Sequence, residues 1–144
     1  MKIDRLEPTF VEYIPVDVEP GKLYISMTYA TTVHLCASGC GNKVVLPLSP
    51  AEWQLQYDGR AVSLSPSVGN WDYPCQAHYW VRANEIRWAR KWSRDEIEAG
   101  QRRDGRALDS MFKHDQVETA PNESTPEDTG IFERFLIFLH IRRK

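Results

Sequence analysis

Four residues in two close pairs have the types and the spacing of a zinc site. The first pair is Cys36 and Cys40, in the string CASGCGNK, and the second is Cys75 and His78, in PCQAHYW. Zinc prefers thiolate and imidazole ligands, and structural sites hold four of them in a tetrahedron. The two pairs use all 3 cysteines of the chain. The sequence therefore predicts one structural Zn²⁺ bound by Cys36, Cys40, Cys75 and His78.

A second histidine, His34, competes for the fourth ligand position. It lies two residues before Cys36, and on a strand both side chains would face the same side. Positions i and i+2 of a strand are roughly 6.5 Å apart, however, which is awkward for two ligands of one ion. We therefore favour His78. Four protein ligands would close the site, whereas three ligands and a water would indicate a catalytic zinc.

The same residues admit two catalytic readings, which the sequence favours less. Ser67, His78 and Asp72 have the residue types of a hydrolytic triad, but no G-x-S-x-G string is present. Cys75 with His78 has the composition of a thiolate–imidazolium pair. Metal binding also accounts for Cys36 and Cys40, so it is the stronger interpretation.

The charge balance and the short apolar runs argue against a nucleic-acid-binding protein and against a membrane-spanning one. The chain has 18 Lys and Arg against 20 Asp and Glu, a net charge of −2, so no overall basic field favours nucleic acid. A stretch from Arg87 to Arg94 interleaves basic residues with Trp88 and Trp92, and we expect it to be a solvated face. No run reaches the roughly 18 apolar residues of a membrane span. The N-terminus lacks the pattern of a signal peptide, so we expect a cytoplasmic protein with reduced cysteines.

The elements that must position the site read mostly as strands. Short β-branched and aromatic runs alternate with Gly, Pro and Asn turns, and Asp58-Gly59 is a hairpin signal. A loop is expected from 65 to 74. The predicted strands cover residues 10–14, 22–29, 31–35, 44–46, 53–57, 61–64, 78–81 and 85–88.

The composition changes after residue 92. Ser93 and Glu96 have the spacing of a helix capping box. We predict a β-dominated fold of zinc-ribbon-like antiparallel sheets with a C-terminal helical extension. Its parts are a β-rich zinc-binding domain (1–92), the helical extension (93–114), a disordered linker (115–130) and an apolar C-terminal segment (131–144).

The order of several strings resembles a family of small bacterial Cys/His zinc-binding proteins of unknown function. The strings are FVEYIP, LYIS, HLCASGCG, W-x-L-x-x-DG, VSLSPSVGN and PCQAHYWVRANEIRW, and they cover roughly residues 9–89. The resemblance implies that Cys36, Cys40, Cys75 and His78 are the metal-binding positions. Ala37 and Ser38 depart from the denser cysteine pattern of that family.

Genes of this family often lie beside bacterial ubiquitin-like conjugation genes, so the resemblance implies protein partners of that kind: a ubiquitin-like, E1-like or E2-like protein. We expect a zinc-stabilised protein-interaction module. The alternative is a peptidase or deconjugating hydrolase that acts on a ubiquitin-like protein. A nucleic-acid-binding module is the second alternative.

Overall fold

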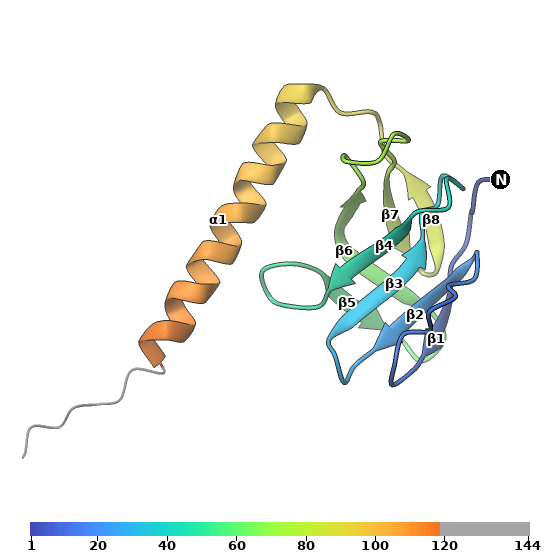
Figure 1. Ribbon diagram of the computed structural model, residues 1–144, viewed down its shortest axis with the longest axis horizontal. Coiled ribbons are helices and arrows are strands. Elements are labelled where there is room, and N and C mark those ends of the chain that lie inside the picture. The colour runs from blue at the N-terminus through green and yellow to red at the C-terminus, as the bar shows by residue number, and fades with distance from the viewer. Residues whose placement is uncertain (119–144) are drawn as a thin grey trace, which may run out of the picture.

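Two four-stranded sheets and one long helix make up the part of the chain that the computed structural model describes, residues 1–118 (Figure 1). The sheets have the strand orders β1-β2-β3-β4 and β5-β6-β7-β8, and α1 follows them. The elements are β1 (Glu7–Phe10), β2 (Lys22–Ser26), β3 (Thr31–Leu35), β4 (Lys43–Pro47), β5 (Gln54–Tyr57), β6 (Val62–Gly69), β7 (His78–Arg82), β8 (Glu85–Trp88) and α1 (Arg94–Glu118).

The prediction of a β-dominated fold with a C-terminal helix is confirmed. Neighbouring strands are antiparallel except for β1, which pairs with β2 in parallel, Glu7 opposite Lys22. The residues just before β1 pair with the other sheet, because Leu6 N–H donates to the Asn84 carbonyl and Ile86 N–H donates to the Asp4 carbonyl. The N-terminal segment therefore links the two sheets along one side.

The second sheet contains a strand that extends into the region where we expected a loop. Strand β6 continues through Gly69, and its register against β7 shifts between Leu64 and Val68. Such a bulge bends a strand and redirects its side chains. Ser67 lies within this irregular stretch, two residues before Gly69, which pairs with His78.

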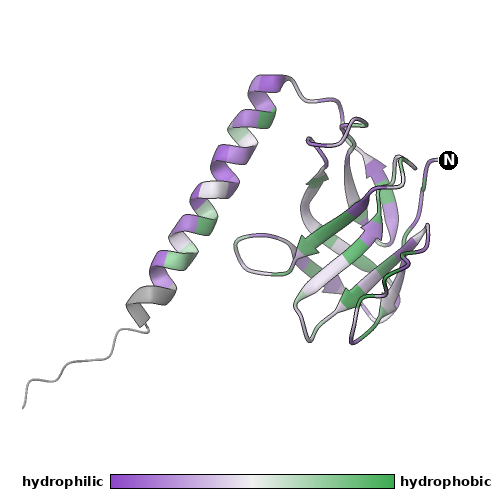
Figure 2. Cartoon of the chain, in the orientation of Figure 1, coloured by the Kyte–Doolittle hydropathy of each residue, from purple (hydrophilic) through white to green (hydrophobic). Residues whose placement is uncertain are grey.

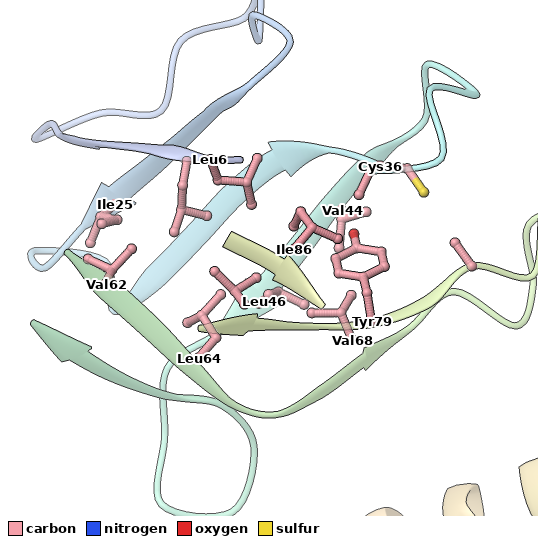
Figure 3. Packing of buried hydrophobic residues seen from close by; sticks show 14 residues of the cluster. Leu6, Ile25, Cys36, Val44, Leu46, Val62, Leu64, Val68, Tyr79 and Ile86 are labelled. Atoms are coloured by element: carbon pink, nitrogen blue, oxygen red, sulfur yellow. The ribbon is translucent and has the colours of Figure 1, made fainter. Parts of the chain in front are cut away.

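The core lies between the two sheets and is built from their inward-facing side chains. Leu23, Ile25, Leu64, Tyr79 and Val81 have no exposed surface. These side chains come from strands of both sheets, and Figure 3 shows Cys36 at one end of the cluster. Burial of apolar surface at about 25 cal/mol per Å² is the main source of stability for such a sandwich. Cys36 thus lies at one end of the shared core.

Helix α1 begins with the predicted capping box and is polar along most of its length (Figure 2). The Glu96 N–H donates to Ser93 Oγ at 3.3 Å, and the Ser93 N–H donates to Glu96 Oε2 at 2.8 Å. The helix ends at Glu118, four residues inside the segment expected to be a disordered linker. The rest of that linker and the segment 131–144 lie outside the described residues. Within the described part, no helix is long and apolar enough to cross a membrane.

Candidate metal centre and the Ser67–His78 cleft

Three cysteines from the two sheets gather at one point. Cys36 follows β3, Cys40 precedes β4, and Cys75 precedes β7. Their sulfur atoms all lie within 4.8 Å of one another, and the sulfurs of Cys36 and Cys75 are 3.8 Å apart. Zn–S bonds of about 2.3 Å in a tetrahedron place two sulfurs about 3.8 Å apart. The three thiols therefore fit a thiophilic metal ion such as Zn²⁺ in donor type and in spacing.

The local surroundings prepare one of these thiols to lose its proton. The Ser38 hydroxyl and the Asn42 backbone lower the pKa of the exposed Cys40 to about 6, from 9.0. Burial raises the pKa of Cys36, although hydrogen bonds from Ser38 and Asn70 oppose this. A cation at the cluster would favour all three thiolates, because metal ligands must be deprotonated.

The loop that carries Cys36 and Cys40 is held by close backbone contacts. Gly39 adopts a φ of +79°, which glycine tolerates best, and a Cβ there would lie 2.2 Å from the Met1 carbonyl oxygen. The Ile3 N–H donates to the Ala37 carbonyl at 2.8 Å. A polar partner also comes from the other sheet, since Asn70 Nδ2 donates to Cys36 Sγ at 3.2 Å. Hydrogen bonds of this kind orient metal ligands.

His78 does not join the three cysteines. Its Nε2 lies 3.0 Å from Ser67 Oγ, and it is absent from the cluster of sulfur atoms that lie within 4.8 Å of one another. The assignment of His78 as the fourth ligand therefore stays a prediction, and the geometry offers this ring a different role. His34, the competing histidine, is fully buried, and its Nε2 lies 2.9 Å from Tyr79 Oη.

Three tryptophans surround the His78 ring. The ring centroids of Trp92, Trp71 and Trp80 lie 4.6, 4.9 and 5.5 Å from that of His78, and Trp71 stacks on Trp92. Burial in this aromatic setting lowers the pKa of His78 below its usual 6.5, outweighing the backbone of Arg90, which acts to raise it. The imidazole is therefore neutral at neutral pH, the state in which it can accept a proton.

The Ser67–His78 pair opens into a cleft of about 430 Å³ between the second sheet and α1. Trp53, Pro66 and Trp71 line the side formed by the sheet, and Gly100, Asp104 and Leu108 line the side formed by the helix. Asp72 lines the cleft too, but it does not complete the triad considered from the sequence. The Nδ1 of His78 is buried and has no hydrogen-bond partner among the described residues.

The sequence contained all of these residues, but it did not reveal which of them meet. Ser67 was assigned to a loop because Pro66 and the Ser and Gly residues around it resemble a turn. The pair becomes evident from the strand register, in which Gly69 pairs with His78 and Ser67 lies two residues before Gly69 on the same strand.

One family of known proteins matches most of the strand-rich region. The family described as "Bacterial ubiquitination-like system serine protease (BubE)" matches residues 10–89, a range that contains Ser67, His78 and the three cysteines. Neither a curated protein nor a solved structure shows a significant match to the chain.

Proposed function

The chain belongs to the family of the bacterial ubiquitination-like system serine protease (BubE), and from that premise we propose that it is a serine peptidase. Ser67 is the nucleophile and His78 the general base. The observation that carries this proposal is the 3.0 Å separation of Ser67 Oγ and His78 Nε2 in an open cleft. A serine needs such a base to attack a carbonyl.

The reaction follows from these two side chains. Ser67 Oγ attacks the carbonyl carbon of the scissile peptide bond, and His78 Nε2 takes the hydroxyl proton. The imidazolium then gives that proton to the leaving amine as the C–N bond breaks. A water molecule, deprotonated by His78, hydrolyses the acyl-enzyme and regenerates Ser67. The aromatic wall supports the ring in place of the carboxylate of a triad, and the backbone of Arg90 is the group beside the ring that favours its protonated form.

The family assignment favours the predicted peptidase over the predicted non-catalytic interaction module. The substrate is a polypeptide of a bacterial ubiquitination-like system, either a ubiquitin-like protein with a C-terminal extension or its conjugate. This keeps the expectation of a ubiquitin-like, E1-like or E2-like protein partner and gives the ubiquitin-like protein the role of substrate.

The metal has a separate, structural role in this proposal. Cys36, Cys40 and Cys75 would hold one Zn²⁺, which would tie the loop after β3 to the loop before β7 that leads directly into His78. Three thiols leave one coordination position for another donor. Within the described residues no histidine or carboxylate joins the cluster, so the general base of this proposal is His78, beside Ser67, and not a residue at the metal. A reducing cytoplasm, the expected location, keeps the thiols free to bind.

The first test is chemical labelling of the nucleophile. A fluorophosphonate probe phosphonylates an activated serine, so we expect modification of Ser67 in the full-length protein and none in Ser67→Ala or His78→Ala. Ser63→Ala is the matched control, because Ser63 lies on the same strand and its Oγ accepts a hydrogen bond from the Ala83 N–H. Mass spectrometry locates the modified residue.

The second readout is hydrolysis of a ubiquitin-like protein fused at its C-terminus to a reporter. Ser67→Ala is expected to reduce the rate by a factor of about 10⁴ or more, as for other serine nucleophiles. Labelling of a different serine, or full activity of Ser67→Ala, would overturn the assignment of the nucleophile.

A further inference from the structure

A cavity lined by arginines lies on the helix side of the Ser67–His78 cleft. Its one acidic lining residue is Glu96. Trp92 also lines it and packs against Gly100 of the helix. The cavity measures about 450 Å³. Its arginines come from the segment before α1 and from two turns of the helix: Arg90, Arg102, Arg103 and Arg106.

The positive charge of this cavity is only partly compensated. Arg90 pairs with Glu96, and Arg102 lies 3.7 Å from Glu98. No ion pair is formed by Arg103 or Arg106 within the described residues, and both side chains are exposed. Two guanidinium groups three residues apart on a helix lie on one face. They present donors to the same region of space without a protein anion between them.

The cavity and the cleft adjoin one another. Trp92 and Arg103 line both of them. Trp92 also packs edge-to-face on the ring of His78, with centroids 4.6 Å apart. A chain bound with its scissile bond at Ser67 would therefore pass close to Arg103 on one side of that bond.

We infer that the arginine-lined cavity is a substrate subsite that binds an acidic stretch of the polypeptide next to its scissile bond. This inference rests on the proposed peptidase activity and names the class of substrate. Guanidinium groups bind carboxylates through paired, charge-assisted hydrogen bonds, which are stronger and more directional than neutral ones. Glutamate and aspartate side chains of an extended peptide are the ligands that two adjacent, unpaired arginines select.

Binding is measured on Ser67→Ala, which cannot turn over the probe. The probes are two short fluorescent peptides of one sequence, one carrying glutamates where the other carries glutamines, and fluorescence anisotropy reports their affinity. We expect the glutamate peptide to bind about tenfold more tightly at low ionic strength, a ratio that two exposed ion pairs supply. Salt should reduce the ratio toward one.

Variants assign the preference to the two arginines. In the Ser67→Ala background, Arg103→Gln/Arg106→Gln should abolish the preference for the glutamate peptide and leave the affinity for the glutamine peptide unchanged. The matched control is Arg60→Gln, because Arg60 is an exposed arginine of the hairpin between β5 and β6, remote in sequence from the cavity. Circular dichroism confirms that each variant keeps its helix.

Two outcomes overturn the inference. Equal affinity for the two peptides, or a preference that survives removal of both arginines, would show that the cavity does not select acidic substrates. Tighter binding of a single-stranded oligonucleotide, lost in the same double variant, would assign the arginines to nucleic acid instead. Fluorophosphonate labelling of the wild-type chain reports separately on the peptidase, so a failure of charge selection leaves Ser67 and His78 as they are.

Discussion

The position of His78 shows that spacing in the sequence does not by itself decide which site a histidine joins. A histidine three positions after a cysteine has the spacing of a zinc ligand. Position 78 opens β7, however, and this ring lies beside the bulged part of β6, with Nε2 directed at Ser67. One position therefore fits two sites, and the neighbouring strand favours one of them.

Zinc content distinguishes the two possible roles of His78, as a zinc ligand and as the partner of Ser67. Cys36→Ser, Cys40→Ser and Cys75→Ser should each lose the bound zinc, because each removes one of three clustered thiols. His78→Ala should retain zinc while losing fluorophosphonate labelling, since its ring contacts Ser67 and not the cluster. Elemental analysis of the purified proteins measures the zinc.

The melting temperature provides the companion measurement. Metal loss would lower Tm by about 2–4 °C for each kcal/mol that the metal contributes to the native state of a chain of this size. His34→Ala is the control: it should lower Tm, because it leaves a buried Tyr79 hydroxyl without its partner, and keep its zinc. Zinc loss in His78→Ala would instead make His78 the fourth ligand.

Sequence reasoning favoured the cysteines and ranked the pair of Ser67 and His78 well below them, and the reason is physical. Three cysteines in a chain without a disulfide pattern have few uses, so their types alone point to a metal. Serine is common, and nothing marks Ser67 among the others in the string VSLSPSVGN. Its role depends on a pairing between β6 and β7 that passes through a bulge, and bulges are not readable from alternation.

At the scale of elements, runs of β-branched and alternating apolar residues predicted well the strands that bury one face. Strand β3 occupies 31–35, as predicted, because its central residues face the core. The expected strand at 10–14 lies earlier, at Glu7–Phe10, and runs parallel to β2. Parallel pairing with the next strand depends on the path of the connection at residues 11–21, and β-propensity contains no information about that path.

Helix α1 packs through Gly100 against Trp92, a side chain that also contacts the His78 ring and lines the cleft. Gly100 is buried, and a Cβ there would lie 3.0 Å from Trp92 Cζ3. Gly105 is exposed, with no atom within 4 Å of the corresponding position. The two glycines lower the helix propensity of the sequence equally, but their surroundings in the structure differ.

A pair of substitutions tests this difference. Gly105→Ala should stabilise the helix by about 1 kcal/mol, the difference in helix propensity, and leave fluorophosphonate labelling of Ser67 unchanged. Gly100→Leu should displace Trp92 from the His78 ring and slow the labelling several-fold. Circular dichroism follows the helix, and mass spectrometry follows the labelling rate. An unchanged rate in Gly100→Leu would mean that the helix does not shape the cleft.

At the scale of the whole molecule, the two sheets divide the chain in order. Residues up to Pro47 build one sheet, apart from the N-terminal segment that also pairs with β8, and residues from Gln54 build the other. The core, however, is shared by both sheets, and the metal cluster takes Cys36 and Cys40 from the first and Cys75 from the second. Neither half holds a complete core or a complete cluster.

Because each half lacks part of the core and part of the cysteine cluster, we expect two fragments of the chain to associate. A cut in the loop between β4 and β5 gives fragments 1–50 and 51–144, and all 5 tryptophans fall in the second. Because the thiols are divided between the fragments, we expect zinc to strengthen their association and to shift the tryptophan emission to the blue. A second fragment carrying Cys75→Ser is the control. If it responds to zinc equally, the ion does not connect the halves; if it fails to respond, a cysteine from each fragment is needed, and zinc concentration sets how much of the two-piece protein assembles.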